Sequence, residues 1–240
     1  MNSSISISEA RDAFSTEDVA LLEAQALGQD AGSAPPRLRL AVPADVLATW
    51  LIPALARVPD MLFDLVIDDQ DTSADWLRRG EVSAAVTGQS RAAPGCDVRP
   101  LGAMRYHATA SPAFCEKWFA QGVTPATLTA APMLTFDRKD QLQVRWLQQK
   151  TGKRLTPPSH HLPSSHGFVA AAQEGLGWGM NPAPLVQKDM EKGRLVSLDA
   201  ALPLDVPLYW QVARIMAPAL APLTAAIKAA ARGALVEVAR

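Results

Sequence analysis

Short apolar runs alternate with helix-like apolar stripes from Arg37 onward. A run of apolar residues bounded by turn formers predicts a strand, whereas apolar residues three and four apart predict a helix. The first part of the chain then predicts strand 38–42, helix 46–55, strand 63–68, helix 73–79 and strand 82–87. Strands joined by crossover helices are typical of a parallel sheet, so this part is predicted to be α/β.

A second unit of the same kind follows. Two strands are expected within 98–110, flanking Gly102, and a helix at 112–119. The second unit is then predicted as strand 133–136, helix 138–149, strand 160–162, helix 165–174 and strand 177–180, and the chain closes with strand 209–213 and helix 218–231. The chain is therefore predicted to form two Rossmann-like lobes with a ligand cleft, lobe I from 37–131 and 206–240 and lobe II from 132–205.

The first 36 residues do not fit this alternation. Residues 1–15 are polar and serine-rich, which is typical of a frayed end. A short amphipathic helix is predicted from Thr16, a possible cap, to Gly28, and the segment 29–36 reads as a linker. We expect this part to be a disordered tail followed by the remnant of a linker helix.

The charge balance argues against direct nucleic-acid binding by this chain. Its 23 Lys and Arg residues against 24 Asp and Glu residues give a net charge of −1, whereas nucleic-acid binding usually leaves a basic patch. The chain has no run of about 18 apolar residues and no signal peptide at Met1, so we expect no membrane association and a cytoplasmic location.

The sequence offers no catalytic, metal-binding or cofactor-binding motif. Its two cysteines and four histidines have no metal-site spacing. The glycine-rich segment 175–180 follows a predicted helix instead of opening one, so it matches neither a phosphate loop nor a dinucleotide fingerprint, and Gly175 is expected at the C′ position of that helix. We expect no cofactor, no metal and no enzymatic activity, because no nucleophile has a base and an orienting group beside it.

Two predicted strand-to-helix turns are candidate ligand contacts, because ligands of open α/β sheets bind at the carboxyl ends of the strands. Asp45 in the first turn either accepts a cationic group or acts as an N-cap. Ser164 and Ser165 open a helix whose free N–H groups favour a carboxylate, although ordinary capping explains them equally well.

Acidic residues mark two further turns. Asp137 follows the predicted strand 133–136, where it either meets a cationic ligand or caps the next helix, with Asp140 interacting with the helix dipole. Asp68, Asp69 and Asp71 gather at another strand end, where a basic ligand or, more often, solvent offsets their repulsion.

In combination, several of these segments resemble the effector-binding domain of LysR-type transcriptional regulators, and more narrowly the arginine- and lysine-responsive subgroup that controls basic amino-acid export. The resemblance covers roughly residues 37–215. The segments that carry it are DVLATWLIPAL at 45–55, DDQD at 68–71, LRRGEV at 77–82 and FDRKD at 136–140.

The resemblance implies a fold like that of type II periplasmic binding proteins, with a small effector in the cleft. It implies that the cationic side chain of lysine or arginine meets Asp45, Asp69 or Asp137, and that the α-carboxylate faces Ser164 and Ser165. Thr49, Thr87 and Gln89 are expected to line the cleft. The family also implies pairing of effector domains into homodimers and of dimers into homotetramers.

The chain departs from the family in one respect. The family begins with a winged helix-turn-helix of about 60 residues, whereas only about 36 residues, neither basic nor patterned for three helices, precede the first predicted strand here. We therefore expect DNA as a partner only if the full-length protein carries that part. A transport-type solute-binding protein and, less favoured, an enzyme on a two-lobed α/β scaffold are the alternatives to an effector-sensing domain.

Overall fold

The computed structural model describes residues 35–67 and 73–237. The chain divides into two compact units: residues 104–206 form unit 2, and the residues before and after them form unit 1. The helix predicted from Thr16 to Gly28 and the acidic segment with Asp69 lie outside the described residues.

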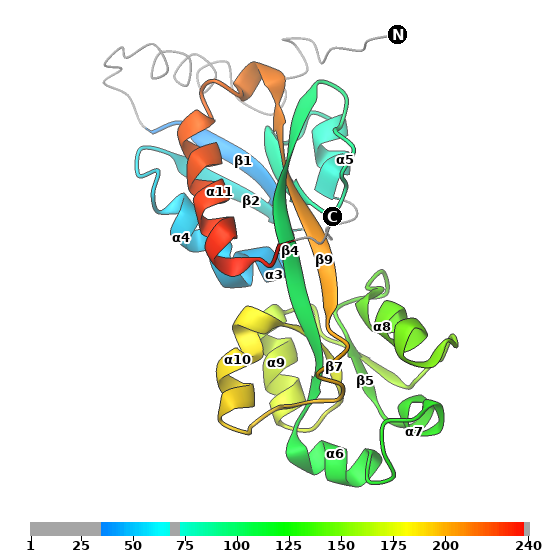
Figure 1. Ribbon diagram of the computed structural model, residues 1–240. Coiled ribbons are helices and arrows are strands. Elements are labelled where there is room, and N and C mark those ends of the chain that lie inside the picture. Colours follow the sequence, from blue (N-terminus) through cyan, green and yellow to red (C-terminus); the bar gives the residue numbers. More distant parts are fainter. Residues whose placement is uncertain (1–34, 68–72, 238–240) are drawn as a thin grey trace. The chain divides into compact units, whose positions relative to one another are not determined.

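Unit 1 is built on a mixed sheet. Strand β1 (Arg37–Val42) lies between β2 (Leu62–Ile67) and β3 (Ala84–Thr87) and is parallel to both (Figure 1). Strand β9 (Leu204–Ala213) pairs antiparallel with β3. The predicted parallel strands are confirmed, and β3 is fully buried, as its continuous apolar sequence indicates.

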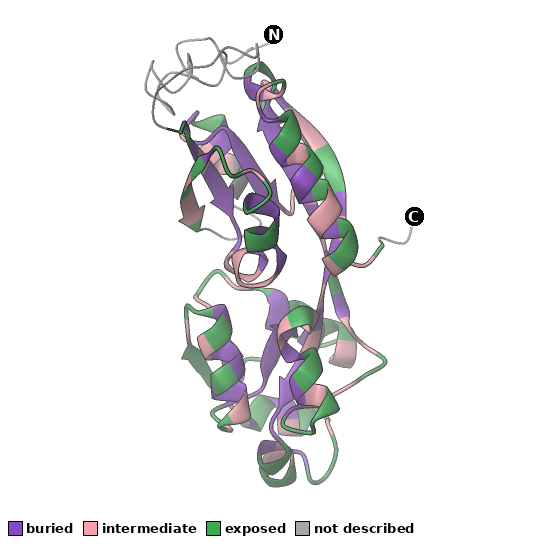
Figure 2. Cartoon of the chain, turned by 90° about the vertical axis from the view of Figure 1, so that its left-hand side faces the viewer, coloured by how far each residue is buried: buried purple, intermediate pink, exposed green. Residues whose placement is uncertain are grey.

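The helix predicted at 46–55 is present but irregular. It runs without a break through α3 (Ala44–Val46), the π-helical segment η1 (Leu47–Leu51) and α4 (Ile52–Leu55). Pro53 has no N–H to offer to the carbonyl of Thr49, which accounts for the widened turn just before it. The helix packs against α11 (Ala221–Ala234), whose buried and exposed positions alternate along its length (Figure 2). Helix α5 (Ser73–Arg78) packs on β3.

One strand replaces the two expected around Gly102. Strand β4 runs without interruption from Cys96 to Ala110. Gly102 has a φ of 127°, and a Cβ there would lie 2.9 Å from the Cβ of Leu235. Ala103 and Val236 exchange both backbone hydrogen bonds beside it. The prediction of two strands was therefore wrong, because this glycine admits the C-terminal segment instead of making a turn.

Two strands each contribute to both units. The chain passes from unit 1 to unit 2 within β4, at Ala103 and Met104, and returns within β9, at Val206 and Pro207. The lobes expected from the sequence placed residues 104–131 in lobe I, whereas the compact units place them in unit 2. Two strands were expected around Gly102, whereas the single strand β4 passes from unit 1 into unit 2 just after this glycine.

Unit 2 contains two groups of strands. The second half of β4 pairs antiparallel with β7 (Gly179–Pro182) and with β8 (Val196–Ser197). Strand β5 (Met133–Thr135) pairs in parallel with β6 (Ser159–His161), and a bridge between Met133 and Trp178 joins β5 to the β7 side.

Five helices cover these strands: α6 (Pro112–Trp118), α7 (Pro125–Ala130), α8 (Leu142–Thr151), α9 (Ser165–Gln173) and α10 (Ala183–Glu191). In unit 2, α9 and α10 lie on one side of β7 and α8 on the other (Figure 1). Gly175, with a φ of 74°, takes the predicted C′ position after α9. Sequence analysis did not predict α7 and α10, which each begin with a proline in the first turn.

Two tryptophans centre the core of unit 2. The side chains of Trp146 and Trp178 are completely buried, and their ring centroids are 5.3 Å apart. The Nε1–H group of Trp146 donates to the carbonyl of Leu202 at 2.9 Å. Leu134 and Phe168 belong to an adjoining apolar cluster with the buried face of α9. Within the described residues, no helix combines the length and the apolar character needed to cross a bilayer.

Candidate functional site

The parallel strands β5 and β6 bring two candidate segments to one edge of unit 2. Thr135 lies opposite His161, its carbonyl accepts from the N–H of Leu162 at 2.9 Å, and its hydroxyl donates to the carbonyl of His160 at 3.1 Å. The chain continues from β5 into Asp137 and from β6 into Ser164. These two predicted site segments therefore start side by side at the carboxyl edge, where ligands of parallel sheets bind.

Helix α9 begins with hydrogen-bond donors that have no acceptor. Ser164 is its N-cap and accepts from the N–H of Gly167 at 3.1 Å. Among the described residues, the N–H groups of Ser165 and His166 donate to no acceptor. The hydroxyl of Ser165 is buried and has no partner either. Because an unpaired buried hydroxyl is costly, this helix start is suited to an anion that accepts from it.

The two carboxylates after β5 have different environments. Asp140 accepts from the N–H of Phe136 at 2.9 Å and from that of Leu142, the first residue of α8, at 2.9 Å. These bonds fix the turn that leads into α8. Burial raises the pKa of Asp140 above its usual value, and the two backbone hydrogen bonds oppose that rise. Asp140 is therefore a structural group of the turn.

Asp137 accepts hydrogen bonds with only one of its two carboxylate oxygens. One of its oxygens, Oδ1, accepts from the N–H of Lys139 at 2.7 Å and from that of Asp140 at 3.0 Å. Its other oxygen has no partner among the described residues. Helix α8 begins only at Leu142, so Asp137 organises the turn before the helix, and the chemistry of its second oxygen would suit a cationic group.

Four candidates lie at the carboxyl edge of the unit 1 sheet. Strands β1 and β3 are parallel, with Ala41 opposite Ala85, so Pro43, which follows β1 and precedes α3, and Thr87, which ends β3, lie toward the same edge. Asp45 lies in the first turn of α3, whose N-cap is Pro43, so the N-cap interpretation of Asp45 was wrong. The hydroxyl of Thr49 donates to the carbonyl of Asp45 at 2.6 Å.

Thr87 and Gln89 are linked to each other. The Thr87 side chain is fully buried, and its hydroxyl accepts from the N–H of Gln89 at 3.1 Å. The side-chain oxygen of Gln89 accepts from Arg78 at 2.6 Å. The structure thus gathers Asp45, Thr49, Thr87 and Gln89 in unit 1 and Asp137, Ser164 and Ser165 in unit 2. Their roles as ligand contacts stay predictions.

Asn181 is among the buried polar residues of unit 2 that sequence analysis missed. Asn181, on β7, is completely buried, and its side-chain nitrogen donates to the hydroxyl of Thr109 at 2.9 Å, while its side-chain oxygen has no partner among the described residues. A single asparagine near a strand end gave no usable signal, because the predicted strand stopped at residue 180.

The buried thiol is not poised for nucleophilic chemistry. Cys96 is almost completely buried, and burial raises its pKa to about 11. Its reactive thiolate is therefore scarce at neutral pH.

Comparison with known proteins identifies the family. The sequence profile described as the LysR substrate binding domain matches residues 31–232. The transcriptional regulator LysG of Mycobacterium tuberculosis is 41% identical over 217 residues, which are 89% of this chain and 71% of LysG. The transcriptional regulator ArgP of Pseudomonas aeruginosa is 41% identical over 212 residues, covering 87% of this chain and 70% of ArgP.

A solved structure agrees with this result. Full-length LysG of Corynebacterium glutamicum with bound effector Arg superposes with a TM-score of 0.78 at 33% identity, covering 92% of this chain and 77% of that one. The relatives are named as transcriptional regulators, not as enzymes or transport proteins, and the predicted two-lobed α/β fold class is confirmed. The chain belongs to the LysR substrate-binding domain family and is an effector-sensing domain of the kind found in the LysG and ArgP regulators.

Proposed function

We propose that this domain senses a basic amino acid, arginine or lysine, and that binding of this ligand controls the transcription of export-type genes. The likeness to a LysG structure that holds the effector Arg supports the choice of ligand. A ligand acts as an effector only by favouring one conformation or arrangement of the protein over another.

The single observation that carries the proposal is the start of α9. Within the part of the chain that the structure describes, the Ser165 hydroxyl is buried without a partner, and it lies beside two N–H groups that have no acceptor. The α-carboxylate of an amino acid supplies oxygens that accept from all three, and the positive end of the helix dipole stabilises its charge. Ser164 fixes the first turn in place by accepting from Gly167.

The same edge of unit 2 offers a group for the cationic side chain. One carboxylate oxygen of Asp137 accepts from no other described residue, and a guanidinium or ammonium group would form a charge-assisted hydrogen bond with it. In unit 1, Asp45, Thr49, Thr87 and Gln89 are the proposed ligand contacts. Asp69, outside the described residues, stays a prediction from the resemblance.

The remaining partners of the domain are part of the same proposal. DNA is a partner of a complete regulator, and a regulator of transcription acts in the cytoplasm, where bacterial DNA lies. Self-association through effector domains stays a prediction. Within the described residues, β2 is an edge strand of its sheet, and its Leu62 and Ile67 are both 45% exposed, which makes it the segment to vary when association is tested.

Calorimetric titration with matched amino acids tests the proposed ligand class. Arginine and lysine should bind, and citrulline, which has the shape of arginine without its charge, should bind at least about tenfold more weakly because it forms no ion pair with an acidic group. Glutamate should not bind. Equal affinity for arginine and citrulline would show that no carboxylate recognises the side chain, and the basic amino-acid assignment would then be abandoned.

A further inference from the structure

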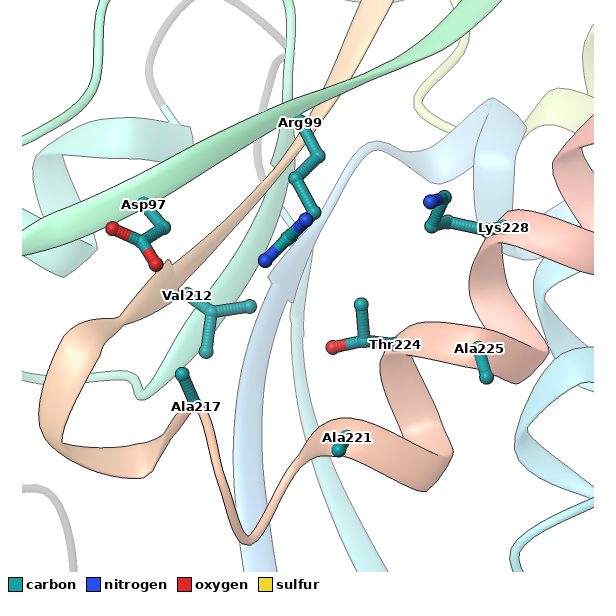
Figure 3. Close-up of a pocket in the computed structure, with 8 residues that line it drawn as sticks. All are labelled: Asp97, Arg99, Val212, Ala217, Ala221, Thr224, Ala225 and Lys228. Carbon is teal, nitrogen blue, oxygen red and sulfur yellow. The ribbon is translucent and has the colours of Figure 1, made fainter.

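Unit 1 has a pocket that shares no residue with the candidate effector contacts. It has a volume of about 280 Å³ and lies between β4, β9 and the first turns of α11 (Figure 3). Its lining residues are Asp97, Arg99, Val212, Ala217, Ala221, Thr224, Ala225 and Lys228. The volume is near the lower limit of about 300 Å³ for small-molecule sites, so the pocket suits a compact ligand.

Two cations of this pocket have no counter-charge. Arg99 on β4 and Lys228 on α11 form no ion pair or side-chain hydrogen bond among the described residues, and both side chains extend into the space between the strand and the helix (Figure 3). The one carboxylate of the lining, Asp97, has Arg214 as a neighbour at 3.9 Å. The pocket therefore carries a surplus of positive charge, and an anion would complement it.

The hydroxyl of Thr224 adds a hydrogen-bond donor to the pocket lining. The Nε1–H of the buried Trp210 donates to the hydroxyl oxygen of Thr224 at 3.1 Å. Because this bond occupies an acceptor site of the hydroxyl, its own proton is left to donate elsewhere. Among the described residues it donates to no acceptor, so it is available to a ligand in the pocket.

The rest of the lining is small and apolar. Val212 lies on β9, and Ala217, Ala221 and Ala225 follow one another along the segment that leads into and forms α11. Such a lining offers no polar partner to a hydrated inorganic ion, but it contacts a short hydrocarbon chain favourably.

We propose that this pocket is a second ligand site, which binds a small organic carboxylate. The guanidinium of Arg99 and the ammonium of Lys228 bind the carboxylate oxygens, the Thr224 hydroxyl donates to one of them, and the methylene groups of the ligand lie against Val212 and the alanines. The proposal goes beyond the sensing of a basic amino acid, because an excess of positive charge disfavours arginine and lysine here.

Calorimetric titration of the whole chain with succinate tests this site. Succinate should bind the unaltered chain, and Arg99→Gln or Lys228→Gln should each weaken it by about tenfold, since each removes a charge-assisted hydrogen bond. The double variant Lys153→Gln/Arg154→Gln is the control for overall charge, because it removes two exposed cations of unit 2 that pair with no carboxylate of the described residues. It should leave succinate binding unchanged, and arginine binding should be unchanged in all variants.

Three results would overturn the proposal. The first is the absence of succinate binding, and the second is an equal loss of affinity in the control, which would mean that overall charge and not the pocket attracts the ligand. The third is inorganic phosphate binding as tightly as succinate, which would show that the apolar lining adds nothing. A failure of arginine to bind the unaltered chain would instead count against the proposed effector and leave this site standing.

Discussion

Replacing Trp146 by alanine should lower the free energy of unfolding by about 3–5 kcal/mol. Its side chain is completely buried against Trp178, with ring centroids 5.3 Å apart. The substitution leaves a large cavity in the core of unit 2, and it also removes the donor that the carbonyl of Leu202 now accepts from. Both effects act in the folded state, so they add to the loss.

Urea unfolding of the two proteins measures this difference. Trp118→Ala is the matched control, because Trp118 is only half-buried at the end of α6. Its ring centroid is 6.1 Å from that of Phe114 and 5.3 Å from the Nζ atom of Lys117. The control should lose much less stability. Equal losses for the two variants would mean that the paired tryptophans do not form the core that the structure describes.

Replacing Asp137 by asparagine should weaken arginine binding by roughly 10- to 150-fold, which corresponds to about 1.5–3 kcal/mol for a hydrogen bond to a charged group. Asparagine keeps a side-chain oxygen that can accept from the N–H groups of Lys139 and Asp140, so the turn before α8 should survive. Only the negative charge is lost. Citrulline binding should therefore change little, and the preference for arginine over citrulline should shrink.

Calorimetry on Asp137→Asn and on Asp60→Asn separates a local effect from a general one. Asp60 is exposed in unit 1 and forms no ion pair or side-chain hydrogen bond in the described part of the chain, so its replacement removes the same charge elsewhere. Arginine affinity should be unaltered in Asp60→Asn. If Asp137→Asn also binds arginine normally, Asp137 is removed from the site.

The alternating elements could be predicted because their signal is local. The apolar run that forms β3 is buried throughout, and the stripe at 46–55 forms the continuous helix from α3 to α4. The strand β4 could not be predicted as one element, because Gly102 serves a contact with Leu235, more than a hundred residues away. A sequence shows the glycine but not the segment that approaches it.

The sequence predicted which turns carry the candidate site, but it did not predict which side-chain atoms in those turns are available to a ligand. The turns with Asp137 and with Ser164 follow from strand ends and helix starts, which are local features. Asp137 has one oxygen without a partner among the described residues, whereas both oxygens of the partly buried Asp140 accept from backbone N–H groups, and this difference depends on the exact backbone path of the turn. The pocket of Arg99 and Lys228 was missed for another reason, because β4 and α11 meet only in the folded chain.

The most direct test of the account is the affinity of Ser165→Ala for arginine and for agmatine, which is arginine without its carboxylate. The unaltered chain should prefer arginine, and Ser165→Ala should reduce that preference about tenfold. The stability of the free protein should not fall, because the Ser165 hydroxyl has no partner in the described part of the chain. A variant that binds both ligands as the unaltered chain does would show that the start of α9 does not bind the carboxylate.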